Sequence, residues 1–563
     1  MAEPRIGVFV CHCGKNIGGV VDVPQVVEYA KGLPNVIYAE HNLYTCSEEG
    51  VGSIKRKIKE NNLNRVIVAS CTPRTHEPLF RSACEEAGMN KYLFEFVNIR
   101  DQCSWVHMHL KEEATEKAKC LVSMGVAKAR FLEPLEEIEI GVTPSVLVIG
   151  GGVAGMNAAL NLANQGFDAH LVEREAELGG LLKGVHRLFT DNRDAQEFIR
   201  STINRVQNHK KIKTYLSASI KEISGFIGNF DVTLLHNQAE NTIKIGTIIV
   251  ATGAQELKPL GQYKYKQMPN VLTQMELEGE MKKGTVSGQN VVMINCVGAR
   301  VPERTYCGRF CCVTAIKNAV LIKEANPEAK VWILHRDLMT YGVEFENYYR
   351  KAMEAGVRFV RYDIDQPPEI IGEGKAQKVK VYHQLMRRWF ELPCDLVVLT
   401  TPMVPNDDNS TISKMLKVPL GQEGFFLEAH LKLQPVEFAT DGVFICGSAR
   451  WPVDITEAIA QAYACASKAA IPLRRGYVKP EPITALVDES RCSGCGICEP
   501  VCAYKAINKV SKNGKTVSEV VTAQCKGCGT CGASCPAGAI TMSHFTDREI
   551  MAQIDAFATF AGA

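Results

Sequence analysis

The stretch SVLVIGGGVAG, residues 145–155, decides the fold of the largest part of this chain. Its apolar first half predicts a buried strand, and its glycines fit the pattern G-x-G-x-x-G that joins a strand to a helix. The first glycine makes the turn, the second lets the backbone approach a pyrophosphate at the helix N-terminus, and the third packs the helix on the strand. The next strand ends at Glu173, whose carboxylate would accept a hydrogen bond from a ribose hydroxyl. We therefore predict a dinucleotide-binding α/β domain.

Two later segments make FAD the predicted dinucleotide. TIIVATGA (247–254) and DGVFICGSA (441–449) are typical of the returning segments of a flavoprotein with two dinucleotide-binding halves. The alternative is that the glycines serve only a turn. The residues predicted to contact FAD are Gly150, Gly152, Val153, Ala154, Gly155, Glu173, Arg174, Gly180, Leu181, Ala251, Thr252, Gly253, Lys317, Asp441 and Gly447.

The second half of the same domain departs from that flavoprotein pattern. The strand predicted at 291–300, VVMINCVGAR, lacks the second glycine motif that would bind NAD(P)H. Flavin disulfide reductases also need a cysteine pair near the isoalloxazine, and the candidate segment GGLLKGVHR (179–187) has none. Both absences argue against a simple pyridine-nucleotide disulfide reductase.

Eight cysteines between residues 483 and 545 form two runs with the spacing C-x2-C-x2-C-x3-C. Three thiolates at this spacing wrap one [4Fe–4S] cluster, and the fourth cysteine of each run ligates the other cluster. Zinc, which also uses C-x2-C pairs, is the alternative. The predicted ligands are Cys492, Cys495, Cys498 and Cys535 for one cluster, and Cys525, Cys528, Cys531 and Cys502 for the second.

A further group of cysteines lies inside the predicted flavin domain. Cys296, Cys307, Cys311 and Cys312 offer four thiolates within 17 residues, which suits one more iron–sulfur cluster. The alternative is that Cys311 and Cys312 begin a helix and pack as small apolar residues. Lys317 follows on the same predicted helix, either as a solvated lysine or as a positive charge beside flavin N5 that stabilises the anionic reduced flavin.

Residues 1–140 alternate apolar strands, such as RIGVFV (5–10) and NRVIVAS (64–70), with helical stretches. This alternation predicts a small α/β domain, whose strand ends converge on one site. Cysteines follow several of these strands and predict a fourth cluster, with zinc or free cysteines as alternatives. Of Cys11 and Cys13 we expect only Cys13 to serve, because side chains two apart share a face only in extended chain. The predicted ligands are Cys13, Cys46, Cys71 and Cys103.

Composition limits the class of protein. With 46% apolar and 22% charged residues, the 563-residue chain is not predominantly disordered. A net charge of +2 and no long basic run do not indicate a nucleic-acid partner. No stretch is long and apolar enough for a membrane span, and no secretory signal is recognised, so we expect a cytoplasmic protein whose 22 cysteines stay reduced. The expected domains are 1–140, 141–480 and 481–545, followed by a helical tail at 546–563.

Several motifs together resemble one family. GVFVCHCG, YTCSEEG, CTPRTHEPLF and QCSWVH occur in the N-terminal domain, and INCVGAR, YCGRFCC and YGVEFENYYR in the flavin domain. These motifs resemble those of HdrA, a subunit of heterodisulfide reductase, and its bacterial relatives, over essentially the whole chain. Longer members carry an inserted ferredoxin domain, whereas residues 228–246, GNFDVTLLHNQAENTIKIG, run from strand to strand without a cysteine.

The resemblance implies a thioredoxin-reductase-like FAD domain between an N-terminal α/β domain with a cluster and a C-terminal two-cluster α+β ferredoxin domain. It also implies a cluster near the two adjacent cysteines and makes Lys317, which follows them, a catalytic residue in contact with the flavin. Members of the family are cytosolic and commonly dimeric. The implied partners are the other subunits of the complex and ferredoxin.

Three functional hypotheses follow. The first is an electron-transfer subunit that takes part in flavin-based electron bifurcation or confurcation between a partner donor, ferredoxin and a second acceptor; bifurcation is implied by the resemblance alone. The second is a stand-alone NAD(P)H-dependent flavin oxidoreductase. The third is a non-catalytic scaffold that passes electrons between clusters and does not bind FAD.

Overall fold

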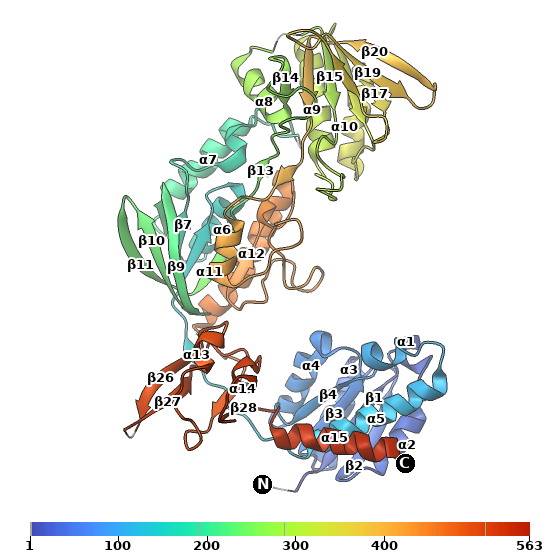
Figure 1. Ribbon diagram of the computed structural model, residues 1–563, viewed down its shortest axis with the longest axis vertical. Helices are drawn as coiled ribbons and strands as arrows, with labels where there is room; N and C mark the ends of the chain where they lie inside the picture. Colours follow the sequence, from blue (N-terminus) through green and yellow to red (C-terminus); the bar gives the residue numbers. More distant parts are fainter. Residues whose placement is uncertain (1–2, 190, 287, 513, 563) are drawn as a thin grey trace. The chain divides into compact units, whose positions relative to one another are not determined.

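The computed structural model describes residues 3–189, 191–286, 288–512 and 514–562. The chain forms two compact units (Figure 1). The terminal unit combines residues 1–139 with 479–563, and the central unit comprises residues 140–478. The chain therefore crosses twice between the units, near residues 140 and 479.

The N-terminal part of the terminal unit is a parallel sheet in the order β2-β1-β3-β4. All residues of β1 and β3 are buried, because helices cover both faces of a parallel sheet. The four strands are β1 (Ile6–Cys11), β2 (Val36–Asn42), β3 (Arg65–Ser70) and β4 (Phe94–Asn98). The helices are α1 (Lys15–Gly18), α2 (Val23–Lys31), α3 (Glu48–Glu60), α4 (Pro73–Glu86) and α5 (Lys111–Ala129), with a π-helical turn at Arg100–Ser104.

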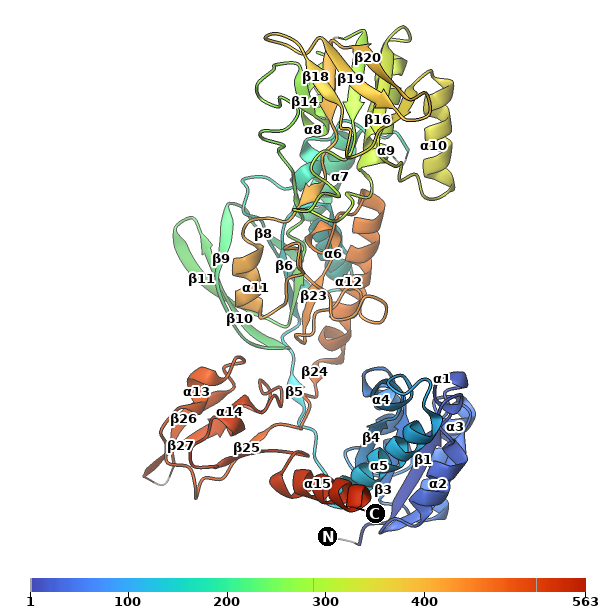
Figure 2. The same cartoon turned by 45° about the vertical axis from the view of Figure 1, so that its right-hand side comes forward.

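The C-terminal part of the terminal unit contains two short antiparallel ribbons and ends in a long helix. The ribbons are β25 (Ala485–Val487) with β28 (Ile540–Met542), and β26 (Ile507–Lys512) with β27 (Lys515–Val520). The helices are α13 (Cys498–Val501), α14 (Thr530–Ala533) and α15 (Asp547–Gly562). Helix α15 lies along α5 (Figure 2), where the guanidinium carbon of Arg548 stands 4.2 Å from the centre of the Phe131 ring.

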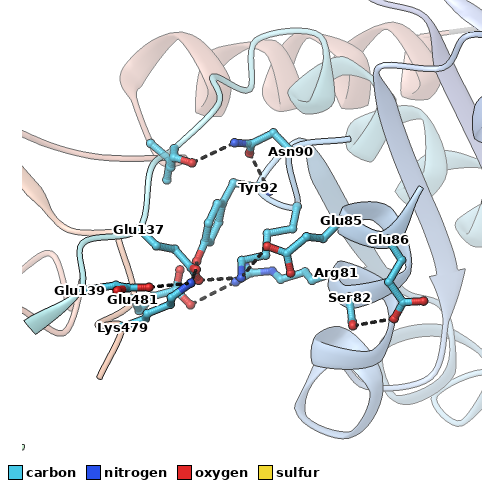
Figure 3. Close-up of polar contacts among 12 residues, drawn as sticks. Arg81, Ser82, Glu85, Glu86, Asn90, Tyr92, Glu137, Glu139, Lys479 and Glu481 are labelled. Atoms are coloured by element: carbon cyan, nitrogen blue, oxygen red, sulfur yellow. Dashed lines mark hydrogen bonds and ion pairs between the residues drawn. The ribbon is translucent and has the colours of Figure 1, made fainter. Parts of the chain in front are cut away.

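Polar contacts tie both crossing segments to the N-terminal part of the terminal unit (Figure 3). Lys91 pairs with Glu137 at 2.6 Å, and the Tyr92 hydroxyl donates to the same carboxylate at 3.0 Å. Arg81 pairs with Glu481, on the returning segment, at 3.0 Å. The outgoing and returning segments are therefore anchored to α4 and the turn that follows it.

The central unit contains two five-stranded parallel sheets. The first has the order β23-β12-β6-β7-β8 and carries the glycine turn predicted at 150–155. Its strands are β6 (Ser145–Ile149), β7 (Asp168–Val172), β8 (Ile212–Tyr215), β12 (Thr247–Val250) and β23 (Val443–Ile445). Its helices are α6 (Val153–Asn164), α7 (Ala195–Gln207), α11 (Asn409–Leu416) and α12 (Ile455–Arg475), with 3-10 turns at Gly180–Lys183 and Gly447–Ala449.

The second sheet has the order β14-β21-β15-β16-β17. Its strands are β14 (Val271–Thr273), β15 (Asn290–Ile294), β16 (Lys330–His335), β17 (Arg358–Arg361) and β21 (Leu396–Leu399). Its helices are α8 (Gln274–Lys283), α9 (Cys311–Ala325) and α10 (Val343–Glu354). A three-stranded antiparallel sheet, β18 (Glu369–Ile371), β19 (Lys378–His383) and β20 (Arg388–Pro393), accompanies it.

A three-stranded antiparallel meander and two short antiparallel strand pairs accompany these sheets in the described part of the central unit. The meander β9 (Ala218–Phe226), β10 (Asn229–His236) and β11 (Ala239–Ile245) flanks the first sheet, and Asn237 and Gln238, with φ of 50° and 61°, form the turn between β10 and β11. β13 (Gln255–Glu256) pairs with β22 (Met403–Val404) between the two halves. β5 (Ile140–Gly141) pairs with β24 (Tyr477–Val478), so the entering and leaving segments run side by side. In the described part of the chain, no helix has the length and apolar character needed to cross a membrane.

Candidate functional site

A cavity of about 460 Å³ lies in the central unit, at the carboxyl ends of strands of the first sheet. Residues from the second sheet and its helices, including Gln274, Lys317 and Thr400, complete its wall. A cavity of this size is in the range that accommodates a cofactor. The predicted residues that line it are Gly150, Gly152, Val153, Ala154, Glu173, Arg174, Gly180, Leu181, Ala251, Thr252, Gly253 and Lys317.

The glycine turn has the geometry expected of a phosphate-binding turn. Gly150 has φ of 111°, and a Cβ atom there would lie 2.3 Å from the carbonyl oxygen of Ala251. A Cβ atom on Gly155 would lie 1.9 Å from the carbonyl oxygen of Gly150, so this glycine permits close packing of α6 on the turn. At Gly152, the N-cap of α6, a Cβ atom would meet nothing within 4 Å. The space above the helix N-terminus is therefore open to an anionic ligand.

Glu173 lies at the end of β7 and is almost fully buried. Its carboxylate accepts hydrogen bonds from the backbone N–H of Gly151 at 2.7 Å and of Glu175 at 2.9 Å. These bonds fix the orientation of the side chain. Because two carboxylate oxygens have about four acceptor sites, the group can still accept from a hydroxyl in the cavity.

Two buried hydroxyls in the cavity wall fit a polar ligand. Within the residues that the structure describes, Thr252 Oγ1 and Thr401 Oγ1 have no hydrogen-bond partner. A buried hydroxyl left unpaired costs free energy, so a polar group of a bound molecule would stabilise this wall. Together with the open α6 N-terminus, the donor and acceptor set fits FAD.

Three predicted FAD residues do not line the cavity. Gly155 lies behind the glycine turn, where it packs α6 on the backbone of Gly150. Asp441 is exposed and precedes β23, whose opposite end faces the cavity. Gly447 lies at the cavity end of β23, where its N–H donates to Gln461.

The structure thus differs from the prediction at Asp441 because that residue stands at the wrong end of the strand. Ser448, the neighbour of Gly447, lines the cavity instead. The sequence did place a turn after this strand, which could have indicated Ser448.

Lys317 lies on the buried face of α9 and forms an ion pair with Glu278 of α8. Its ammonium group also donates to the backbone carbonyl of Arg187 at 2.8 Å, and Glu278 accepts from the N–H of His186 at 2.7 Å. Burial lowers the pKa of Lys317, and the carboxylate of Glu278 acts in the opposite direction. Both side chains line the cavity. Sequence reasoning missed Glu278, whose only signal was a position on the buried face of an amphipathic helix.

Cys311, on the same helix as Lys317, also lines the cavity and belongs to a group of four thiols. Burial, together with the neighbouring Cys312 and Cys307, raises the pKa of Cys296 to about 11. A hydrogen bond between Cys311 and Cys312 raises the pKa of Cys311 and lowers that of Cys312. The four predicted cysteines therefore converge beside the cavity.

The eight C-terminal cysteines line two separate small cavities, four to each. The backbone N–H groups of Ser518, Ala506 and Ala539 donate to their sulfurs at 3.3 to 3.5 Å, as is favourable for thiolate ligands. In the ranges that the structure describes, no three His, Cys, Asp or Glu side chains are close enough to hold one metal ion. One cavity is lined by Cys492, Cys495, Cys498 and Cys535, and the other by Cys502, Cys525, Cys528 and Cys531.

The N-terminal cysteines group differently from the prediction. Burial raises the pKa of Cys46, and Cys11 and Cys13 add to the effect. The pKa of Cys71 is raised by burial and by the same two thiols, against the influence of Arg100. The N–H of Cys13 donates to the sulfur of Cys11 at 3.2 Å, because Cys13 has φ of 46° and the chain turns back there. Cys11 and Cys13 therefore lie together despite being only two residues apart.

Cys103 lies apart from this group. Its thiol is fully buried and donates to the backbone carbonyl of Ala114 at 3.0 Å, in the packing between the π-helical turn and α5. Burial raises its pKa to about 11, with Lys117 acting in the opposite direction. The structure thus brings Cys11, and not Cys103, next to Cys13, Cys46 and Cys71.

Comparisons with known proteins agree with these two cofactor regions. The model of the pyridine nucleotide-disulphide oxidoreductase family matches residues 144–469, and that of the 4Fe-4S dicluster domain matches residues 485–542. One of the two HdrA iron-sulfur subunits of CoB–CoM heterodisulfide reductase from Methanopyrus kandleri is 39% identical, over 98% of this chain and 98% of that protein. This chain belongs to the HdrA family of heterodisulfide reductase subunits.

A second member of the HdrA family comes from the H(2):CoB-CoM heterodisulfide,ferredoxin reductase of Methanothermobacter marburgensis. It is 38% identical over 99% of this chain and 98% of that protein. These alignments run over 648 and 650 residues, more than the 563 of this chain, so both relatives carry residues that are absent here. Lactococcus lactis thioredoxin reductase aligns with 59% of this chain and 100% of its own at 18% identity and a TM-score of 0.43.

Membership of the HdrA family confirms the predicted fold class. The chain combines an α/β flavin domain of the pyridine nucleotide-disulphide oxidoreductase type with a C-terminal ferredoxin-type domain. It is an oxidoreductase with flavin and iron–sulfur regions.

Proposed function

We propose that this chain is the FAD- and iron–sulfur-containing electron-transfer subunit of a heterodisulfide-reductase-like complex. In this proposal the cavity of the central unit binds FAD, and the groups of cysteines hold [4Fe–4S] clusters. When bound, FAD exchanges electrons in pairs or singly, whereas each cluster exchanges one electron at a time.

One observation carries the proposal. Cys311 belongs to a converging group of four cysteines and at the same time lines the cavity, next to Lys317 on the same helix. A flavin in the cavity and a cluster on these cysteines would therefore share a wall. A shared wall would suit an electron-splitting subunit, in which electrons that arrive as a pair must be divided between carriers.

The residues around the cavity have defined parts in binding. The N-terminus of α6 offers backbone N–H groups to a pyrophosphate, and Glu173 is held ready to accept from a ribose hydroxyl. Lys317 places a positive charge in the wall, where it would stabilise an anionic reduced flavin, and Glu278 holds the ammonium group in position. These parts extend the predicted role of Lys317 to a pair of residues.

For the clusters we propose Cys296, Cys307, Cys311 and Cys312 beside the cavity, together with the two C-terminal sets that exchange their fourth ligands. For the N-terminal cluster we replace Cys103 by Cys11, because Cys11 lies beside Cys13 and the Cys103 thiol points at Ala114. The N-terminal set is then Cys11, Cys13, Cys46 and Cys71.

We further propose that the protein takes part in bifurcation or confurcation among a partner donor, ferredoxin and a second acceptor. The names of relatives, which include a heterodisulfide,ferredoxin reductase, support this assignment. The names of these relatives as subunits support partner subunits. The homodimer is proposed from the resemblance of the sequence motifs to the family alone. The 22 free cysteines fit the reducing cytoplasm.

A stand-alone NAD(P)H oxidoreductase is the competing function, and one feature of the second sheet argues against it. In the place where a glycine turn would lead from β15 into a helix, the chain continues into a loop that carries Cys296 with φ of 63°. The next helix, α9, begins only at Cys311. The segment after β15, where a nicotinamide dinucleotide would bind, thus carries cysteines in place of a glycine turn.

Anaerobic purification, followed by counts of acid-extracted flavin, iron and sulfide, tests the proposal. We expect stoichiometric FAD and four clusters, and no bleaching of the flavin by NADH or NADPH in the isolated chain. Clusters without FAD would favour a scaffold, and rapid bleaching would favour the stand-alone oxidoreductase. In a Lys317→Ala preparation that retains FAD, turnover in the complex should be lost; unchanged turnover and flavin potential would contradict the role of Lys317.

A further inference from the structure

The hairpin β26–β27 of the terminal unit carries three lysines in contrasting surroundings. Lys512 is neutralised by two carboxylates, Glu489 and Glu519, each at 2.9 Å. Lys515 donates instead to the backbone carbonyl of Ser490 at 3.2 Å, and it also contacts the carbonyl of Glu489. In the part of the chain that the structure describes, Lys509 has no ion pair, and neither has Lys515. Two of the three positive charges are therefore uncompensated.

These two charges lie over the cysteine group that contains Cys492 and Cys495. A Cβ atom on Gly496 would come within 3.0 to 3.2 Å of the Cδ, Cε and Nζ atoms of Lys509, so that side chain lies directly across the loop next to Cys495. The hydrogen bond from Lys515 to the carbonyl oxygen of Ser490 places the second ammonium group beside the backbone two residues before Cys492.

The cysteine group reaches the surface of the unit at this loop, next to Lys509. Cys495 is exposed, whereas Cys492 and Cys498 are buried. The side chain of Ile497, two residues from Cys495, is 44% exposed. An exposed ligand is thus flanked by one apolar side chain and two unpaired positive charges.

We propose that this surface, formed by Cys495, Ile497, Lys509 and Lys515, docks an acidic one-electron carrier protein of the ferredoxin class. Interfaces of electron-transfer proteins are small, and complementary charges bring the partners together quickly without holding them long. The inference rests on the proposed function, since it needs a cluster on Cys492, Cys495, Cys498 and Cys535. In the step, one electron leaves this reduced cluster and reduces the oxidised cluster of the carrier; no bond breaks and no proton moves.

The competing explanation is that the lysines only balance the negative charge of the cluster itself. The two explanations differ in what they predict. Docking charges affect the encounter with an acidic protein, whereas charges that balance the cluster affect its reduction potential.

The experiment uses the full chain, loaded with its cofactors and reduced anaerobically, and mixes it with an oxidised acidic plant-type [2Fe–2S] ferredoxin. Rapid-freeze EPR follows the ferredoxin signal. Compared with wild type, Lys509→Glu/Lys515→Glu should lower the second-order rate by about tenfold at low ionic strength, and the difference should vanish at high salt. Lys512→Gln, on the same hairpin, should change the rate by less than about twofold because that charge is already neutralised.

Two further measurements decide between the explanations. Reduction of a small uncharged quinone and the cluster potential, measured by EPR-monitored redox titration, should be the same in all variants. A shifted potential, an equal loss with the quinone, an unchanged ferredoxin rate, or an equal loss in Lys512→Gln would each overturn the docking proposal. If wild type reduced neither acceptor, the proposed function itself would fail, which is a different outcome.

Discussion

Lys317 and Glu278 form an ion pair whose side chains are only 2% and 1% exposed, in the wall of the cavity that we assign to FAD. Two helices of the second half, α9 and α8, contribute one residue each. Removing one partner of such a pair leaves an uncompensated buried charge, whereas removing both does not.

Lys317→Met should therefore destabilise the central unit by about 3–5 kcal/mol, and the double variant Lys317→Met/Glu278→Leu should recover most of that loss. Chemical denaturation, followed through the unfolding of the central unit, measures both. A single variant as stable as wild type would show that the pair is not a buried charge pair in solution.

Gly152→Ala and Gly155→Ala separate folding from cofactor binding. A Cβ atom at Gly152 meets no protein atom, but it occupies the space assigned to the pyrophosphate, so we expect a folded protein that binds FAD at least about tenfold more weakly. A Cβ atom at Gly155 would collide with the backbone at Gly150, so we expect lower stability as well. Circular dichroism melting and flavin fluorescence titration distinguish the two effects; full FAD affinity in Gly152→Ala would contradict the site.

Glu173→Gln should weaken FAD binding, since an amide replaces one acceptor oxygen by a donor facing the N–H groups of Gly151 or Glu175. We expect a loss of about 1–3 kcal/mol in binding free energy. Glu177→Gln, at an exposed position outside the cavity wall, is the control. Equal affinities of the two variants would remove Glu173 from the site.

The exchange of fourth ligands between the C-terminal clusters can be tested by paired cysteine variants. If Cys535 serves the cluster of Cys492, then Cys492→Ala/Cys535→Ala should lose the iron and sulfide of one cluster, while Cys492→Ala/Cys502→Ala should lose two. Iron and sulfide analysis of the purified variants provides the count. The opposite order would mean that each run ligates its own cluster.

In the N-terminal part, Cys11→Ala should abolish the cluster signal of that region, whereas Cys103→Ala should keep it. Cys103→Ala removes only a buried thiol that donates to Ala114, so its main effect should be a stability loss of about 1 kcal/mol. EPR in the Cys492→Ala/Cys502→Ala background, which should lack both C-terminal clusters, compares the remaining N-terminal and flavin-domain signals between the two variants. Retention of the cluster in Cys11→Ala would restore Cys103 as the candidate.

The predictions that agree best with the geometry depend on spacing along the chain. The two C-x2-C-x2-C-x3-C runs and the glycine turn at 150–155 each span a few residues, so local backbone geometry fixes where their side chains and N–H groups point. The structure accordingly places most of the predicted FAD residues around one cavity, and all eight C-terminal cysteines in two groups.

The residues that sequence reasoning missed depend on tertiary packing or on one unusual dihedral angle. Glu278 meets Lys317 across 39 positions of sequence, and no motif connects α8 with α9. Spacing along the chain argues against Cys11, because the side chains of residues two apart diverge in most conformations. The positive φ of Cys13 turns the chain back and removes that objection. The flavoprotein pattern of segment 441–449 predicts Asp441 in the site, but only the far end of that segment reaches the cavity.

The pairing of α15 with α5 has a consequence for biosynthesis. Both helices belong to the terminal unit, yet the whole central unit is translated between them. During synthesis, the surface of α5 that α15 covers therefore stays exposed while the central unit is translated. It is covered only after residues 547–562 have left the ribosome. Truncated or stalled nascent chains would keep that surface exposed. We therefore expect chaperones to bind these incomplete chains more than the full-length protein.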